Sequence, residues 1–279
     1  MMPIEPGLYV TATPIGNLKD VTYRVIETLK AADQILCEDT RQTAKLCAAY
    51  GVETPRRPYH EHNADRVLPE ILAALQGGAT LCLVSDAGTP LISDPGYRLV
   101  RRARDAGVKV TPLPGPAAFV AALSAAGAPT DRFTFAGFPP SKAVARGKFF
   151  AGLSPHAATL VFYESPSRLA DSLAAMAEAF GERRACVARE ITKLHEEFRE
   201  DSLAGLAEHY REARPKGEIV VIVHPPKPQG PPDETEIDAF LAHALERQSV
   251  KEAAAVAAIT LGVSKNLAYS RALFLKDKK

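Results

Sequence analysis

The first 113 residues alternate between short apolar, β-branched runs and segments with the spacing of amphipathic helices. The runs are LYVTAT, QILCE, TLCLVS and VKVTPL, and the helical segments are VTYRVIETLKAAD, RQTAKLCAAYG, VLPEILAALQGG and YRLVRRARDAG. Each run is too apolar for a strand with one wet face, which is typical of a parallel sheet covered by helices on both faces. The pattern therefore predicts an α/β domain with a mainly parallel sheet over residues 1–113.

A second series of elements follows over residues 114–225. Its strand-like runs are RFTFAGF, ATLVFYES, RACVARE, EEFRE and GEIVVIV, and helical segments such as SRLADSLAAMAEAFG and SLAGLAEHYREA lie between some of them. EEFRE follows RACVARE after only a short connection, and such a connection fits antiparallel strands. We therefore expect a mixed α+β domain.

The composition then changes. HPPKPQGPPDE is rich in proline and polar residues, which predicts a linker over residues 226–232. Residues 233–279 have three helical segments, with a break at Gly262 and an N-cap at Ser264, as in a helix-turn-helix. This small helical module either packs on the main body or contacts nucleic acid, and Lys265 and Arg271 slightly favour RNA.

The overall charge excludes recognition by a global basic field, because Lys and Arg number 34 against 33 for Asp and Glu. The four cysteines are scattered among apolar runs, so neither a disulfide framework nor a zinc site is indicated. His60-Glu61-His62 lacks a third ligand at suitable spacing, so we expect no metal. Because no targeting segment or membrane-length apolar run is present, we expect a soluble, cytoplasmic protein without membrane contact.

The stretch VSDAGTPLISDPG, residues 84–96, carries two aspartates and no lysine or arginine. Carboxylates would repel a phosphate and attract a cationic group, so the loop suits S-adenosylmethionine, which carries a sulfonium and an ammonium. Asp94, followed by Pro95, is expected to be the N-cap of the next helix. Asp86 has no such role and is the stronger cofactor candidate, so Asp86→Ala is expected to abolish cofactor binding.

Three other loops, ATPIGN, CEDTR and PLPGPAA, follow strands of the same sheet and should converge with this loop, because ligands bind at the carboxyl ends of parallel strands. Alternatives remain for two motifs. In EDTRQ, Asp39 and Gln42 could form only a capping box, and in YESPSR, Ser165 with Pro166 could simply begin a helix. The segment REITKLHEEF is unusually rich in charges for a plain turn, which favours a functional role there.

Together these motifs resemble one family. ATPIGNLKDVTYR, CEDTRQT, YHEHN, VSDAGTPLISDPGYRLV, PLPGPAA, GAPTDRFTFAGFPP, FYESPSR, ARE-TK-HEEF and GEIVVIV occur in the order found in bacterial 16S ribosomal RNA cytidine 2′-O-methyltransferases, which belong to the tetrapyrrole methylase superfamily. The resemblance covers Gly7 to about Val223. Ala117 departs from the usual serine after PGP, and Ser167 from the usual histidine after ESP.

The resemblance implies a two-domain tetrapyrrole-methylase-like fold that binds S-adenosylmethionine between the domains, and a homodimer. By position, the implied cofactor residues are Pro14, Ser85, Asp86, Gly88, Thr89, Ala117 and Ala118 (by their backbones), Phe162 and Tyr163. The implied reaction is 2′-O-methylation of a decoding-centre cytidine, cytidine 1402 of 16S ribosomal RNA, in the small ribosomal subunit.

A 2′-hydroxyl is a poor nucleophile until its proton is removed, so a general base should assist the transfer. The candidates are Asp39, Glu61 and Glu164, with His60 as a further possibility. Arg41 and Arg168 are expected to contact RNA phosphates. Two other functions remain open: a small-molecule, tetrapyrrole-type methylase and a non-catalytic RNA-binding assembly factor.

Overall fold

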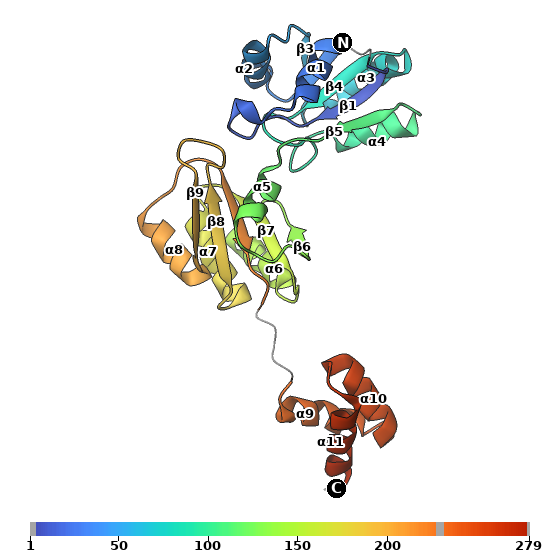
Figure 1. The fold of residues 1–279 in the computed structure, drawn as a ribbon, viewed down its shortest axis with the longest axis vertical. Helices are drawn as coiled ribbons and strands as arrows, with labels where there is room; N and C mark the ends of the chain where they lie inside the picture. Colours follow the sequence, from blue (N-terminus) through green and yellow to red (C-terminus); the bar gives the residue numbers. More distant parts are fainter. Residues whose placement is uncertain (1–3, 227–231, 278–279) are drawn as a thin grey trace. The chain divides into compact units, whose positions relative to one another are not determined.

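The computed structural model describes residues 4–226 and 232–277 of the 279-residue chain. The chain divides into two compact units, Met1–Pro225 and Pro226–Lys279, and each is considered by itself (Figure 1). Most of the expected linker, residues 227–231, lies outside the described residues.

The first part of the large unit contains a parallel sheet with the strand order β3-β2-β4-β1-β5. Its strands are β1 (Gly7–Thr11), β2 (Gln34–Cys37), β3 (Arg56–Pro58), β4 (Thr80–Val84) and β5 (Val110–Leu113). Its helices are α1 (Tyr23–Ala31), α2 (Thr40–Tyr50), α3 (Ala64–Gln76) and α4 (Tyr97–Asp105), with a short 3-10 helix η1 (Leu18–Asp20) after β1. The expected parallel α/β sheet is confirmed.

Two hydrophobic clusters cover the two faces of this sheet. One contains Val25 and Leu29 of α1 with Cys47 of α2, and the other contains Ile71 of α3 with Leu99 of α4. The central strand β4 is buried along its whole length, as its apolar sequence predicts. Strand β3 was not predicted, because this three-residue edge strand reads Arg-Arg-Pro and shows no apolar or β-branched pattern.

The second part of the large unit contains a mixed sheet with the order β6-β7-β10-β8-β9. Its strands are β6 (Phe133–Phe135), β7 (Thr159–Glu164), β8 (Arg184–Arg189), β9 (Glu197–Ser202) and β10 (Ile219–Val223). Its helices are α5 (Ala118–Ala125), α6 (Ala143–Leu153), α7 (Leu169–Phe180) and α8 (Leu203–Glu212). β6 and β7 are parallel and the other pairs are antiparallel, so the expected mixed α+β architecture is confirmed.

The two faces of the mixed sheet differ in their cover. Residues of α6, α7 and α8, such as Phe150, Leu173 and Leu206, pack on one face, whereas Ala122 and Leu123 of α5 pack on the other. Helix α6 was not predicted. Its sequence contains two glycines and buries only Arg146 and Phe150, so it lacks a clear apolar stripe.

The small unit comprises α9 (Glu234–Ala244), α10 (Val250–Leu261) and α11 (Lys265–Asp277), and its helical character is confirmed (Figure 1). Its core is rich in alanine and includes Ala254, Ala257, Ala268 and Ala272. Gly262 ends α10 in the left-handed region with φ 67°, and the Ser264 hydroxyl accepts a hydrogen bond from the Leu267 amide at 3.2 Å. These contacts fix the turn between the last two helices.

Among the described residues, no helix combines the length and the apolar character needed to cross a membrane. The four cysteines are buried free thiols.

Candidate functional site

The loops after β1, β2, β4 and β5 meet at the carboxyl edge of the parallel sheet. Thr13 and Gly88 exchange two backbone hydrogen bonds of 2.9 and 3.0 Å, which join the loops after β1 and β4. The Thr89 hydroxyl donates to the Pro116 carbonyl at 3.0 Å, and the Asp39 amide donates to the Asp86 carboxylate at 3.0 Å. The parallel topology thus brings the four loops together as expected.

The loop after β4 has an unusual backbone. Gly88 has φ 83°, and Leu91 and Ser93 have φ 74° and 63°, in the left-handed region that side chains usually avoid. For Leu91 and Ser93, which are not glycines, such conformations cost about 1–3 kcal/mol each and cluster at ligand-binding sites. A side chain at Gly88 would also come within 3.3 Å of Ile15, so glycine allows this loop to pack closely against the loop after β1.

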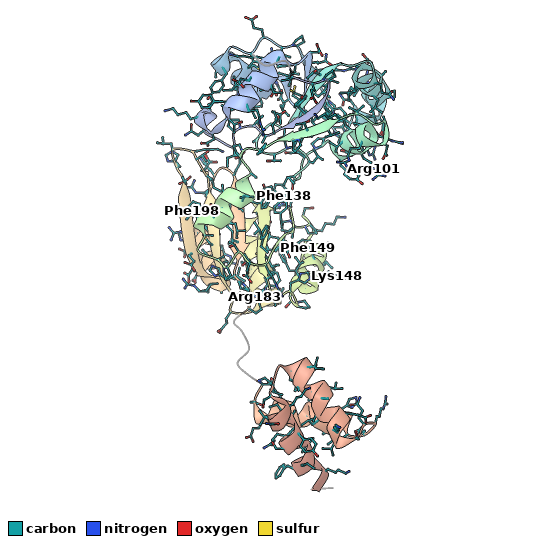
Figure 2. The ribbon with its side chains drawn as sticks, turned by 45° about the vertical axis from the view of Figure 1, so that its right-hand side comes forward. Arg101, Phe138, Lys148, Phe149, Arg183 and Phe198 are labelled. Atoms are coloured by element: carbon teal, nitrogen blue, oxygen red, sulfur yellow. The ribbon has the colours of Figure 1, made fainter. Side chains whose placement is uncertain are left out.

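A cavity of about 390 Å³ lies between this edge and the mixed sheet. The first sheet's loops contribute Ile15, Ala87, Gly88, Thr89, Ile92, Ser93 and Asp94. The second part contributes Ala117, Ala118, Phe138, Tyr163, Glu164, Ser165, Pro166, Ile191, Gly217, Glu218, Ile219 and Val220. Phe138 lies at the side of the mixed sheet that faces the first domain (Figure 2).

The charged residues that line the cavity are Asp94, Glu164 and Glu218; no lysine, arginine or histidine is found among its described lining residues. Two of these acids already have cationic partners. Glu164 pairs with Arg168 at 2.7 Å, and Glu218 pairs with Lys193 at 2.9 Å. In the described part of the chain, Asp94 has no ion pair, so it is the carboxylate that can respond to a bound cation.

The pKa of the half-buried Asp94 carboxyl is raised to about 6. Burial is the main cause, the carboxylates of Glu38 and Asp86 add to it, and a hydrogen bond with Ser85 opposes the shift. The expectation that Asp94 caps the next helix is wrong. Helix α4 begins at Tyr97 with Gly96 as its N-cap, and no side chain caps it, so the Asp94 carboxylate is left for the cavity.

Five of the residues assigned to the cofactor line the cavity: Gly88, Thr89, Ala117, Ala118 and Tyr163. Ser85 lies buried behind the loop, where its hydroxyl donates to the Gly88 carbonyl at 3.1 Å, and so it positions the lining residues.

The other three assigned residues do not line the cavity. Pro14 does not line the cavity, whereas its neighbour Ile15 does. Asp86 is exposed, and its carboxylate accepts a hydrogen bond from the Asp39 amide in the loop after β2. Phe162 is fully buried on the other face of β7, with its ring 5.5 Å from that of Phe150. Because side chains alternate along a strand, Tyr163 faces the cavity and Phe162 cannot.

Several lining residues were missed in the sequence. Asp94 was assigned to a helix cap. Phe138 and Ile191 lie in the motifs GAPTDRFTFAGFPP and ARE-TK-HEEF, which pointed to the site without indicating which side chain faces the cavity. Their position depends on the packing of two domains, which local patterns do not show.

The three general-base candidates lie in different environments. Asp39 is the N-cap of α2, and hydrogen bonds from Arg41 hold the pKa of its carboxyl below its usual value, which makes it a weak base. Glu164 is buried and accepts from the Ser165 amide at 2.7 Å as well as pairing with Arg168, so it anchors the start of the next helix. Glu61 is exposed in a neighbouring hollow. His60, the further possibility, has a buried Nδ1 without a hydrogen-bond partner among the described residues.

The arginines and lysine assigned to RNA also differ. The Arg41 side chain is 88% exposed despite its ion pair with Asp39, and Lys265 is exposed at the start of α11. Arg168 is held by Glu164. Arg271 pairs with Asp238 and, at 2.6 Å, with Glu234, so its guanidinium joins α11 to α9 rather than pointing freely to solvent.

The charged turn between β8 and β9 connects the two domains beside the cavity. The Thr192 hydroxyl accepts a hydrogen bond from the Asn17 amide at 3.0 Å, and Lys193 pairs with both Glu190 and Glu218 at 2.9 Å. Ile15 and Ile191, next to this contact, line the cavity from opposite domains. The uncharged hydrogen bond between Asn17 and Thr192 therefore joins the two domains at this end of the cavity, while the ion pairs of Lys193 stay within the second domain.

Within residues 4–226 and 232–277, no group of three or more histidine, cysteine or acidic side chains is arranged to hold a metal ion.

Comparisons with known proteins agree with this architecture. Residues 7–207 match the family of tetrapyrrole (corrin/porphyrin) methylases, and residues 231–276 match the RsmI C-terminal HTH domain. Among solved structures, the methyltransferase CobJ matches with a TM-score of 0.61 and 21% identity over 79% of this chain and 94% of its own. The cobalt precorrin-4 methyltransferase CbiF matches with a TM-score of 0.60 and 17% identity over 78% and 94%. At such identities these two structures show the fold alone.

Relatives of higher identity match almost the whole chain. Ribosomal RNA small subunit methyltransferase I of Mesorhizobium japonicum is 50% identical over 99% of this chain and 94% of its own length. The protein of the same name from Pseudomonas aeruginosa is 45% identical over 97% and 98%. This chain therefore belongs to the tetrapyrrole methylase family and, within it, to the family of ribosomal RNA small subunit methyltransferase I.

Proposed function

We propose that this protein transfers a methyl group from S-adenosylmethionine to the ribose 2′-oxygen of cytidine 1402 of 16S ribosomal RNA in the small ribosomal subunit. The observation that carries the proposal is a cavity of about 390 Å³ whose charged lining residues are all acidic, with Asp94 lacking an ion pair in the described chain. The names of the relatives support a ribosomal RNA substrate.

The cavity suits a cofactor with both an aromatic ring and positive charge. Its volume is within the range of about 300–1,000 Å³ that is usual for small-molecule sites. Asp94 is ionised at neutral pH and would attract the sulfonium or the ammonium, and the rings of Phe138 and Tyr163 offer faces for stacking or cation–π contact. Gly88, whose backbone amide and carbonyl are paired with Thr13, lines the cavity without a side chain and so leaves room for a ligand.

The residues of the chain mainly position the reaction. S-adenosylmethionine supplies a methyl group that is already activated by its sulfonium, so a metal is not required. The strained loop around Gly88 and the contact of Thr192 with Asn17 fix the cavity walls, which helps to align the attacking oxygen with the methyl carbon. Asp39, Glu61 and Glu164 stay candidates for the base, although Asp39 and Glu164 are already ion-paired.

Helix α4 adds a basic surface beside the cavity. It carries Arg98, Arg101, Arg102 and Arg104 against one acid, Asp105. Arg101 lies on the surface of the first domain, where it can reach an RNA phosphate (Figure 2). Because the total charge is near neutral, we expect recognition to need the shape of the assembled subunit. We further expect a homodimer to be the active form and the protein to act in the cytoplasm.

One experiment tests the proposal directly. Small subunits from cells that lack this protein are incubated with the purified protein and tritium-labelled S-adenosylmethionine, and the product RNA is mapped by mass spectrometry. We expect one added methyl group on the ribose of cytidine 1402, and faster transfer to subunits than to bare 16S RNA. Cofactor binding without transfer to RNA would contradict the proposal, as would transfer to a tetrapyrrole in a parallel incubation that replaces the subunits.

A further inference from the structure

A second hollow lies next to the proposed cofactor cavity. It has a volume of about 140 Å³ and is lined by Tyr59, Glu61, Ala64, Asp94, Pro95, Gly96, Tyr97 and Arg98. Asp94 also lines the larger cavity, so the two hollows meet at this carboxylate. A molecule held in the second hollow therefore lies beside the cofactor.

The size of the hollow limits what it can hold. At about 140 Å³ it has roughly a third of the volume of the larger cavity, which suits one planar ring and excludes a second cofactor. Its floor includes the fully buried ring of Tyr59, and burial raises the pKa of this phenol, so the hydroxyl stays protonated. Tyr59 therefore offers a ring and an uncharged hydroxyl to the hollow.

The rim of the hollow carries three side chains suited to a nucleobase. Tyr97 is 71% exposed, and such a ring can stack on any base. Glu61 is an exposed carboxylate and can only accept hydrogen bonds while ionised. Arg98 provides donors and is held by Asp65 at 2.8 Å.

A free carboxylate discriminates between the two pyrimidines. Cytosine presents an exocyclic amine, to which Glu and Asp are the usual acceptors, whereas uracil presents a carbonyl oxygen at the same position. Glu61 would therefore attract cytosine and repel uracil. Because Glu61 lines the second hollow and not the cofactor cavity, this role in recognition fits its position better than proton removal at the methyl group.

We propose that the hollow takes the base of the target nucleotide, turned out of its stack, with a cytosine amine on Glu61 and the ring against Tyr97. The ribose of that nucleotide then lies at Asp94, facing the cofactor. The inference rests on the proposed methylation of RNA and adds the residues that choose the base.

Discrimination between cytidine and uridine tests the role of Glu61. Small subunits are assembled with either nucleotide at the target position, and kcat/KM for methyl transfer is measured for each. The unaltered protein should prefer cytidine. Glu61→Gln should reduce this preference about tenfold, because the amide can donate to uracil as well as accept from cytosine. The matched control Glu53→Gln, at an exposed residue outside both hollows, should keep the full preference.

The outcomes separate this inference from the proposed function. Failure of the unaltered protein to methylate cytidine subunits would overturn the proposed function. Normal transfer with the same cytidine preference in Glu61→Gln would overturn the inference alone. Equal loss of kcat for both nucleotides in Glu61→Gln would also overturn it, since that result is expected of a general base.

Tyr97 supplies an independent test. Tyr97→Phe keeps the ring and should keep KM for the subunits, whereas Tyr97→Ala should raise KM about tenfold, as loss of a base stack usually does. Calorimetry should show unchanged cofactor affinity in both variants. The control Tyr23→Ala removes a still more exposed tyrosine of α1 that lines neither hollow, and its KM should not change. Equal KM values for Tyr97→Ala and Tyr23→Ala would refute the assignment.

Discussion

The cofactor cavity contains an acid, Asp94, that has no ion pair in the described chain, whereas the small helical unit contains an arginine, Arg271, with two acidic partners. In the cavity, burial raises the pKa of Asp94, and the like charges of Glu38 and Asp86 raise it as well. In the helical unit, Arg271 is surrounded by Asp238 and Glu234, which join two helices. A charge that lacks a partner costs stability, and it is retained where a ligand provides the partner. A charge with partners contributes to the fold.

The largest effect is expected at Asp94. Asp94→Asn should lower the affinity for S-adenosylmethionine roughly ten- to a hundredfold, because a contact between charged groups is worth about 1.5–3 kcal/mol. Calorimetry measures the affinity, and a thermal scan should show a midpoint that is unchanged or higher, since a repelled carboxylate is removed. The control is Asp86→Asn, which we expect to have the smaller effect because Asp86 lies outside the cavity. A larger loss in Asp86→Asn would restore the assignment made from sequence.

The second prediction concerns pH. Only ionised Asp94 attracts the cofactor, so affinity should fall by up to about tenfold per unit as the pH drops below about 6. Stability of the free protein should change in the opposite direction. The pKa of Asp94 in the folded protein, about 6, lies above its ordinary value of 3.8. The contribution of Asp94 to the free energy of unfolding is therefore complete below pH about 4 and is lost as the pH rises through 6. Calorimetry and denaturant unfolding from pH 4 to 8 measure both effects.

The same comparison explains what the sequence could predict. Strand β4 and helix α10 could be predicted because each follows a local pattern. The residues of β4 form a continuous apolar run, and those of α10 place apolar side chains on one face of a helix. Asp94 was misassigned because Asp-Pro before a helical run satisfies a local rule as well, although the helix begins three residues later, at Tyr97. Phe162 and Tyr163 are adjacent, and the sheet places one in the core and the other in the cavity. Such choices depend on long-range packing, which periodicity does not contain.

A third and smaller effect is expected in the helical unit. Arg271→Ala removes the guanidinium that joins α11 to α9 through Glu234 and Asp238, so the unfolding midpoint of this unit should fall by a few degrees. Affinity for S-adenosylmethionine should not change, because this residue lies in the other compact unit. Circular dichroism of the full chain measures the transition, with Arg247→Ala on the exposed surface as the control. An unchanged midpoint together with weaker RNA methylation would show that Arg271 serves RNA, as its sequence context suggested.

The smallest effect is expected at Lys265, and it tests whether the helical unit contacts RNA at all. Lys265 lies exposed at the N-terminus of α11, where a cation opposes the helix dipole by about 0.3 kcal/mol or more. Lys265→Ala should therefore leave this unit slightly more stable. If the Lys265 side chain neutralises one phosphate, the Lys265→Ala variant releases one counterion fewer when it binds RNA. The KM of this variant for small subunits should then rise severalfold at low salt and approach that of the unaltered protein at high salt. Identical KM values at every salt concentration would instead assign α11 to packing or protein contacts and leave α4 as the basic surface beside the site.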